Sequence, residues 1–186
     1  MSAATDRFFI ALLPSQAIQD EANAIKQVFV DRYDSRAALK SPPHVTLQPP
    51  FEWSLEALPL LTQQLSEFSA QSAPLSITLS GFGAFPPRVI YINVIKTQAL
   101  LALQAALMAD TEQALGIVDE TAKARSFSPH MTVAFRDLTQ ENFKRAWAEF
   151  EYRPLELEFT ATHLTLLRHD GQRWLIDTEF PFLGSE

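Results

Sequence analysis

Two short stretches of the chain carry residue types suited to proton transfer. Pro-Pro-His-Val-Thr-Leu at 42–47 and Ser-Pro-His-Met-Thr-Val at 128–133 each place a His two residues before a Thr. Successive side chains of a β-strand point to opposite faces, so His44 shares a face with Thr46, and His130 with Thr132. Two such strands at one cleft would supply two imidazoles for proton transfer and two hydroxyls for hydrogen bonds to an oxyanion.

The flanking residues decide how much the His-x-Thr pattern means. The pattern occurs three times in a chain with four His, the third time at His163. Because Thr is common in strands, the bare pattern fits polar residues on the solvated face of a sheet equally well. Proline precedes His44 and His130, whereas Thr162 precedes His163. We therefore interpret His163 as structural or solvent-facing.

The elements that must position the two His-Thr pairs occur twice. A buried strand at 7–13, a helix after Ser15, a loop at 31–41 and the His44 strand come first. They are matched by a strand at 89–94, a helix at 98–115, a loop at 117–128 and the His130 strand. This duplication predicts a pseudo-two-fold axis that brings the two His strands to equivalent places in a shared cleft. His163 lies outside the duplicated units.

The rest of the chain adds helices and strands without a linker. We expect helices at 59–68 and 139–150, strands at 75–79, 155–159, 162–168 and 174–180, and a turn at 81–87. His169 opens a hairpin turn, and Pro49 and Pro50 are expected to end the His44 strand. The sequence thus favours one domain, 1–186, made of two pseudo-symmetric lobes. Its fold class would be α+β, with two antiparallel-rich sheets facing a central cleft and helices outside.

Composition narrows the function classes. With 47% hydrophobic and 20% charged residues, the chain has an ordinary globular composition. It contains no cysteine, and the His spacing includes no His-x-His or His-Glu-x-x-His, so neither a metal nor a cofactor is expected. The net charge of −7 argues against a broad grip on duplex nucleic acid, but is compatible with a small phosphate site. We find no secretory signal and no membrane-spanning stretch, and expect a cytoplasmic protein.

Several stretches resemble one known family, the 2H phosphoesterases, and within it the bacterial 2′-5′ RNA ligase-like proteins. The likeness is strongest at residues 125–134, where an Arg, an aromatic residue and a Pro precede His-x-Thr in the family's order. It also covers residues 8–11, 43–47, 81–83, 85–86 and 88–89. The chain departs from the commoner pattern at Gln-Pro-Pro-Phe, 48–51, where many members have an apolar run and a Gly.

The resemblance implies a bilobal α+β fold and a metal-free phosphodiesterase acting on 2′,3′-cyclic or 2′-5′ linkages of RNA ends or small nucleotides. His44 and His130 would be the acid and the base, in an order that the sequence does not assign. Thr46 and Thr132 would hydrogen-bond the phosphate oxygens, and Arg125 would pair with the phosphate. Arg88 and Arg136 are weaker candidates for phosphate, and each also fits a solvated charge at a strand end. An aromatic residue such as Phe8, Phe51 or Phe127 could stack on a base, although most phenylalanines must form the core.

Other functions remain open at this stage. Joining RNA ends through a 2′-5′ bond is the same chemistry in reverse. A non-catalytic RNA or nucleotide binder and a plain structural domain are alternatives from other classes. We expect a monomer whose partner is an RNA end or a small cyclic nucleotide, but the sequence does not identify the natural substrate or its length.

Overall fold

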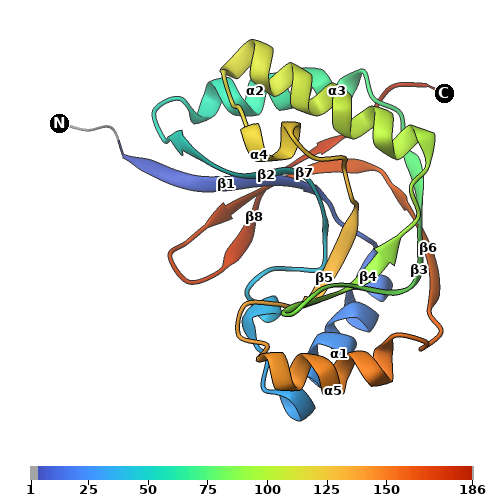
Figure 1. Cartoon of the computed structure of the whole chain (residues 1–186). Coiled ribbons are helices and arrows are strands. Elements are labelled where there is room, and N and C mark those ends of the chain that lie inside the picture. The colour runs from blue at the N-terminus through green and yellow to red at the C-terminus, as the bar shows by residue number, and fades with distance from the viewer. Residues whose placement is uncertain (1–3, 186) are drawn as a thin grey trace.

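The computed structural model of the protein describes residues 4–185 and contains two four-stranded sheets with helices on their outer faces (Figure 1). The strand order is β2-β1-β7-β8 in the first sheet and β5-β4-β3-β6 in the second. All neighbouring strands are antiparallel. The expected α+β class, with antiparallel sheets and outer helices, is confirmed.

The chain forms β1 and β2 of the first sheet, then all four strands of the second, and returns to the first sheet for β7 and β8. The strands are β1 (Thr5–Leu12), β2 (Val45–Ser54), β3 (Leu75–Phe85), β4 (Val89–Val94), β5 (His130–Ala134), β6 (Glu156–Ala161), β7 (His163–His169) and β8 (Trp174–Pro181). The helices are α1 (Gln16–Tyr33), the 3₁₀ turn η1 (Ala37–Lys40), α2 (Leu58–Ala70), α3 (Gln98–Leu115), the short α4 (Glu120–Lys123) and α5 (Gln140–Phe150).

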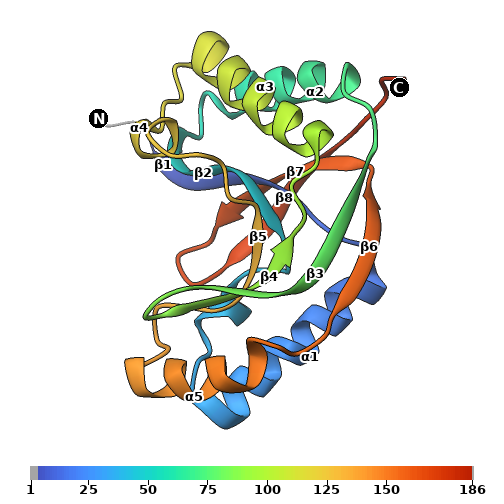
Figure 2. The same cartoon turned by 45° about the vertical axis from the view of Figure 1, so that its right-hand side comes forward.

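The two sheets correspond strand by strand. β2 and β5, which carry the His-Thr pairs, are edge strands, and each lies beside the strand that opens its unit, β1 or β4. The helices are exchanged, because α1 follows β1 but packs on β5, while α3 follows β4 but packs on β2. Figures 1 and 2 show α2 and α3 on one side of the molecule and α1 and α5 on the other. A single buried apolar cluster includes residues of both sheets.

Capping residues account for several of the predicted helix boundaries. The Thr97 side chain accepts a hydrogen bond from the Leu100 amide, and Gly116 ends α3 with φ of +67°, so the helix covers the predicted residues. Thr139 caps α5 in the same way, by accepting from the Asn142 amide. Ser15 precedes α1, but its side chain makes no capping hydrogen bond.

Two predicted strand ends are wrong, both because a bulge lets the strand continue. β2 passes through Pro49 and Pro50 to Ser54, with its register shifted between Phe8 and Ile10 of β1. Prolines are tolerated there because β2 is an edge strand with one unpaired side. β3 likewise continues through the predicted turn at 81–87 as far as Phe85, with a register shift at residues 79–82.

The alternation predicted for the His-Thr strands is observed. Val45, Leu47, Met131 and Val133 are buried, while the His and Thr side chains between them stay half-buried on the opposite face. His44 lies one residue before β2, and His130 is the first residue of β5. Within residues 4–185 no helix combines the length and the apolar character needed to cross a membrane.

Candidate functional site

A cavity of about 660 Å³ lies where the two His-bearing strands meet. Its lining includes His44, Thr46, His130 and Thr132, so the structure brings both predicted pairs together. Its other walls come from η1, from the segment after β5, and from His169 and Trp174 at the β7–β8 hairpin. The volume is within the range of small-molecule sites, about 300–1,000 Å³.

The two histidines are held in the same way. Nδ1 of His44 is 2.7 Å from the Pro42 carbonyl oxygen, and Nδ1 of His130 is 2.7 Å from the Ser128 carbonyl oxygen. A carbonyl only accepts, so each Nδ1 donates its hydrogen, and Nε2 of a neutral ring keeps the lone pair. A proline stands between each carbonyl and its His, and its fixed φ favours this geometry.

Burial sets the charge of both imidazole rings. It is the largest cause that lowers the pKa of His44, to about 4, and Lys26 and His130 lower it further. Burial also lowers the pKa of His130, against the hydrogen bond to Ser128. Both rings are therefore neutral at pH 7. An anion bound beside them would favour their protonated forms.

Aromatic side chains hold each imidazole from the neighbouring strand. Phe9 of β1 packs on His44 and on Trp174, with both pairs of ring centroids 4.7 Å apart. Tyr91 of β4 packs on His130 at 5.1 Å, and also contacts Phe85, which itself packs on His130 at 5.1 Å. The two halves of the cavity therefore share one arrangement, in which a His lies against an aromatic pair.

A glycine lies beneath one of these rings. A Cβ atom at Gly83 would lie 2.4 Å from Cε2 of Tyr91, closer than real atoms approach. The Gly83 position therefore allows Tyr91 to lie across β3 and pack on His130. The second glycine of the Gly-Phe-Gly stretch at 81–83 thus makes room for the Tyr91 ring to pack on His130.

The aromatic residues singled out from the sequence lie elsewhere. Phe8 is fully buried and packs on Phe51 in the core, and Phe127 also packs against that core. None of the three lines the cavity, whereas their strand neighbour Phe9 does. Because successive residues of β1 face opposite ways, the sequence could not tell which of the two adjacent phenylalanines faces the cavity.

Only one of the three arginines proposed from the sequence lines the cavity. Arg125 and Arg88 are exposed and do not line it, so their contact with a phosphate stays a prediction. Arg36, Lys40 and Arg136 do line it. Arg136 was a weaker candidate, and the other two lie in a loop whose fold has no periodic sequence signal.

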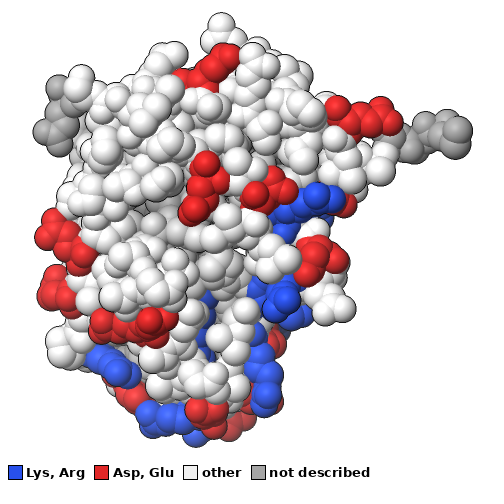
Figure 3. Space-filling model, turned by 180° about the vertical axis from the view of Figure 1, so that it is seen from behind, with Lys and Arg blue, Asp and Glu red and all other residues white. Residues whose placement is uncertain are grey.

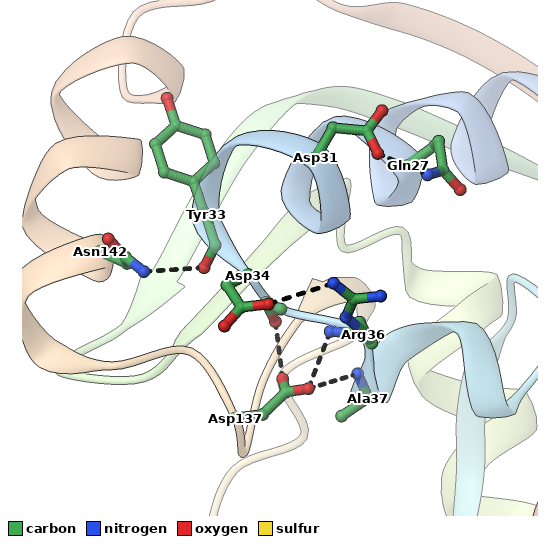
Figure 4. A network of polar contacts seen from close by, with 9 residues as sticks. Gln27, Asp31, Tyr33, Asp34, Arg36, Ala37, Asp137 and Asn142 are labelled. Carbon is green, nitrogen blue, oxygen red and sulfur yellow. Dashed lines mark hydrogen bonds and ion pairs between the residues drawn. The ribbon is translucent and has the colours of Figure 1, made fainter.

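Two further polar residues support the walls and were missed. Lys26 is 1% exposed, and its Nζ donates to the Ser41 carbonyl at 2.9 Å. Asp137 accepts hydrogen bonds from Ser35 Oγ and from the amides of Arg36 and Ala37 at 2.8–2.9 Å (Figure 4). One residue therefore holds the chain just before His44, and the other fixes η1 to the end of β5.

The two remaining histidines differ in whether they line the cavity. His163 is exposed, is bonded to its neighbour Thr162 and does not line the cavity. His169 does line it, although the sequence indicated only a turn residue. Its Nδ1 accepts from the Gly171 amide, opposite to the donor role of Nδ1 in His44 and His130. Among residues 4–185 no cluster of three His, Asp or Glu side chains is arranged to hold a metal ion.

Comparison with known proteins gives one consistent family. The sequence model of the 2′-5′ RNA ligase superfamily matches residues 14–173. A protein of Geobacillus thermodenitrificans (strain NG80-2) named "Putative phosphoesterase" is 30% identical over 183 residues, which cover 97% of this chain and 98% of the relative. A protein of Bacillus pumilus (strain SAFR-032) with the same name is 30% identical over 184 residues, covering 97% and 99%.

Solved structures share the fold at lower identity. The protein TT0787 of Thermus thermophilus superimposes with a TM-score of 0.72 at 22% identity, covering 97% of this chain and all of that one. E. coli LigT complexed with 3′-AMP gives a TM-score of 0.68 at 17% identity, covering 96% and 99%. At these identities the likeness extends to the fold only.

Proposed function

The chain belongs to the 2′-5′ RNA ligase superfamily, and from that membership and the paired histidines we propose that it is a metal-independent phosphodiesterase. Its substrates would be 2′,3′-cyclic or 2′-5′ phosphodiester linkages of RNA ends or small nucleotides. The observation that carries the proposal is the matched pair of Nδ1–carbonyl contacts at His44 and His130. In both rings these contacts leave Nε2 as the atom that exchanges protons. Histidines that merely lay on the solvated face of a sheet would not need this matched orientation.

Hydrolysis of a cyclic phosphate requires one neutral and one protonated imidazole. The base removes a proton from water as its oxygen attacks phosphorus, and the acid protonates the ribose oxygen as the P–O bond breaks. The low pKa of His44, about 4, suits the base. His130 is then the acid, protonated under the influence of the anionic phosphodiester.

The two threonines complete the proposed site. Thr46 and Thr132 line the cavity on the same strand faces as the histidines. Their hydroxyls would donate hydrogen bonds to the non-bridging oxygens, where charge grows in the transition state. Arg36, Lys40 and Arg136, which also line the cavity, would balance the phosphate charge. Arg125 remains a proposed contact for a longer substrate, from outside the cavity.

The same groups support the reverse reaction. In 2′-5′ ligation of RNA ends the two rings would exchange roles, with His130 as the base and His44 as the acid. A non-catalytic nucleotide binder remains the alternative from another class. Product formation separates it from both enzymes, because a binder shows affinity without turnover.

The test compares variants at the three His-x-Thr sites in buffer with excess EDTA. His44→Ala and His130→Ala should each lower kcat for a nucleoside 2′,3′-cyclic phosphate by about 10²-fold or more. The double variant should lose little more, because the two rings act together. His163→Gln is the matched control and should stay within a few-fold of wild type, with circular dichroism checking the fold. Near-normal turnover in either alanine variant contradicts the two-histidine mechanism.

A further inference from the structure

A second cavity opens beside the histidine cavity. It has a volume of about 610 Å³, and it shares Lys40, Arg136 and His169 with the first. Its own wall adds Arg7 and Arg173, which do not line the histidine cavity. We call it the branch groove. A ligand bound between His44 and His130 can therefore extend into the branch groove without leaving the protein surface.

The branch groove is basic in an acidic protein. It is lined by four of the 15 Lys and Arg residues of a chain whose net charge is −7, and by no Asp or Glu. On the face shown in Figure 3, Lys and Arg atoms gather along the right-hand and lower parts, while the upper part carries only Asp and Glu. A local positive potential of this kind attracts anionic groups.

Most of these charges have no carboxylate partner. The Arg7 guanidinium lies 5.6 Å from the centre of the Trp174 ring, and that of Arg136 lies 5.0 Å from the centre of the Phe135 ring. Such contacts orient a cation but do not neutralise it. No ion pair is recorded within the described part of the chain for Arg7, Lys40 or Arg136.

Arg173 is the partial exception. Its Nε lies 3.8 Å from Asp170, whose carboxylate also accepts hydrogen bonds from the amides of Gln172 and Arg173 at 2.8 Å. Asp170 therefore stabilises the hairpin, and its contact with the guanidinium is a loose one. The positive charge of the groove is largely uncompensated.

The four basic side chains converge from separate parts of the fold. Arg7 comes from β1, Lys40 from η1, Arg136 from the segment just after β5, and Arg173 from the β7–β8 hairpin. Arg136 also has φ of +61°, a left-handed conformation that costs a non-glycine residue about 1 kcal/mol or more. The hydrogen bonds of the adjacent Asp137 to η1 hold this segment in place. Convergence and backbone strain together indicate a binding site rather than a solvated face.

We propose that the branch groove binds a second phosphate group of the substrate, adjacent to the phosphodiester held between His44 and His130. This inference rests on the proposed function. Arginine suits the role because its planar guanidinium forms paired hydrogen bonds with phosphate oxygens. The second phosphate would come either from the next internucleotide linkage of an RNA end or from a 5′-phosphate on the reacting nucleotide.

A kinetic comparison separates these sources. The three substrates are a nucleoside 2′,3′-cyclic phosphate, the same compound with a 5′-phosphate, and a dinucleotide that ends in a 2′,3′-cyclic phosphate. Wild type should prefer one of the two substrates that carry a second phosphate by about tenfold or more in kcat/KM. That preference should also weaken as salt rises. Preference for the dinucleotide alone identifies the internucleotide phosphate, and preference for the 5′-phosphorylated compound identifies the terminal one.

The variant Arg7→Gln/Arg173→Gln should remove this preference and leave the unphosphorylated mononucleotide within about twofold of wild type. Neither residue lines the histidine cavity, so the variant changes none of the side chains around His44 and His130 that form its wall. Arg145→Gln/Arg153→Gln, in and just after α5, removes the same charge away from both cavities and should keep the preference. Equal losses of kcat/KM on all three substrates, or no preference in wild type, would contradict the binding of a second phosphate in the branch groove.

Binding to an inactive protein keeps this result distinct from the proposed reaction. In His44→Ala/His130→Ala, calorimetry compares a nucleoside 3′-phosphate, its 3′,5′-bisphosphate and a dinucleotide 3′-phosphate. Tighter binding of a ligand with the extra phosphate, lost when Arg7 and Arg173 are also changed to Gln, supports the groove even if wild type turns over nothing. Equal affinities in both backgrounds refute the groove, whatever the activity.

Discussion

The protonation states at the cavity follow from burial acting on three side chains, His44, His130 and Lys26. Removal from water disfavours the charged form of each, and it is the largest cause of all three lowered pKa values. For the histidines the result is a pair of imidazole rings that are neutral at pH 7. For Lys26 it is a buried amine with a pKa of about 8, placed under the turn that leads to His44.

Replacing Lys26 by Met should change how stability depends on pH. The pKa of Lys26 is about 8 in the folded protein and about 10.4 in the unfolded chain, so the unfolded state binds more protons between these values. This group therefore makes the wild type more stable as pH rises from 8 to 10.5. Relative to Lys26→Met, the free energy of unfolding should rise by up to about 3 kcal/mol across that window, as measured by urea unfolding. A difference in the free energy of unfolding that stays constant across this pH window would show that the pKa of Lys26 is not lowered in the folded protein.

The sequence predicted the His-Thr pairs because alternation along a strand is local, whereas the burial of Lys26 depends on tertiary packing. Residues two positions apart in a strand lie on the same face of the sheet. The burial patterns of β2 and β5 follow this alternation. The buried face of α1 includes the apolar Ile25, and its neighbour Lys26 is buried as well and donates to the Ser41 carbonyl. A polar residue that becomes buried only in the tertiary structure leaves no periodic signal.

Among the elements, η1 has the weakest sequence signal and an important place at the site. It comprises only Ala37–Lys40, yet this segment supplies part of the cavity wall and leads into the prolines before His44. Asp137 holds the start of this segment by accepting from two successive amides and from Ser35 Oγ (Figure 4). This contact crosses from the end of β5 to the other half of the duplicated chain.

Asp137→Ala should therefore loosen η1 and lower activity together. We expect faster hydrogen exchange at residues 35–41 and a loss of about 1–2 kcal/mol in the free energy of unfolding, because three hydrogen bonds to a carboxylate at the surface are removed. The value of kcat/KM should fall several-fold, since the η1 wall is displaced. Asp31→Ala is the matched control, because Asp31 accepts only from the exposed Gln27 side chain. Unchanged exchange in Asp137→Ala would show that packing alone holds η1.

Element boundaries were predictable where a cap marks them and unpredictable where a bulge extends a strand. α3 covers the predicted residues 98–115, and Thr97 and Gly116 cap its two ends, because capping chemistry is local. Pro49 and Pro50 suggested a strand end, since proline lacks the amide that a ladder needs. β2 continues because it is an edge strand with a shifted register, and the sequence of one strand does not reveal its place in a sheet.

At the scale of the whole molecule, the site exists because two similar halves meet. Each half contributes one His, one Thr and one aromatic pair, and neither half alone provides both members of the proposed acid–base pair. The duplicated order of elements predicted the meeting of the His strands. The exchange of α1 and α3 between the sheets was not predicted, because it depends on packing between segments far apart in the chain.

In the proposed mechanism the two rings act as one acid–base pair, so the pH dependence of kcat/KM should report both halves at once. The pair is active with one ring neutral and one protonated, so activity should peak between the two apparent pKa values of the free protein. The pKa of His44 is about 4 and that of His130 is below its usual value near 6.5. For a nucleoside 2′,3′-cyclic phosphate we therefore expect a bell-shaped profile with its maximum on the acid side of pH 6.5.

Each limb of that profile has its own check. The alkaline fall marks loss of the His130 proton, and in the kcat profile it should lie at higher pH, because the bound phosphate stabilises imidazolium. The acid fall marks protonation of His44. Stability should also decline from pH 6.5 to 4, because the unfolded chain takes up this proton first, so circular dichroism must accompany the assay. In Lys26→Met the acid limb should move to higher pH, since the charge that helps to lower the pKa of His44 is gone. A kcat/KM that keeps rising towards pH 8 would contradict the assignment of His130 as the acid.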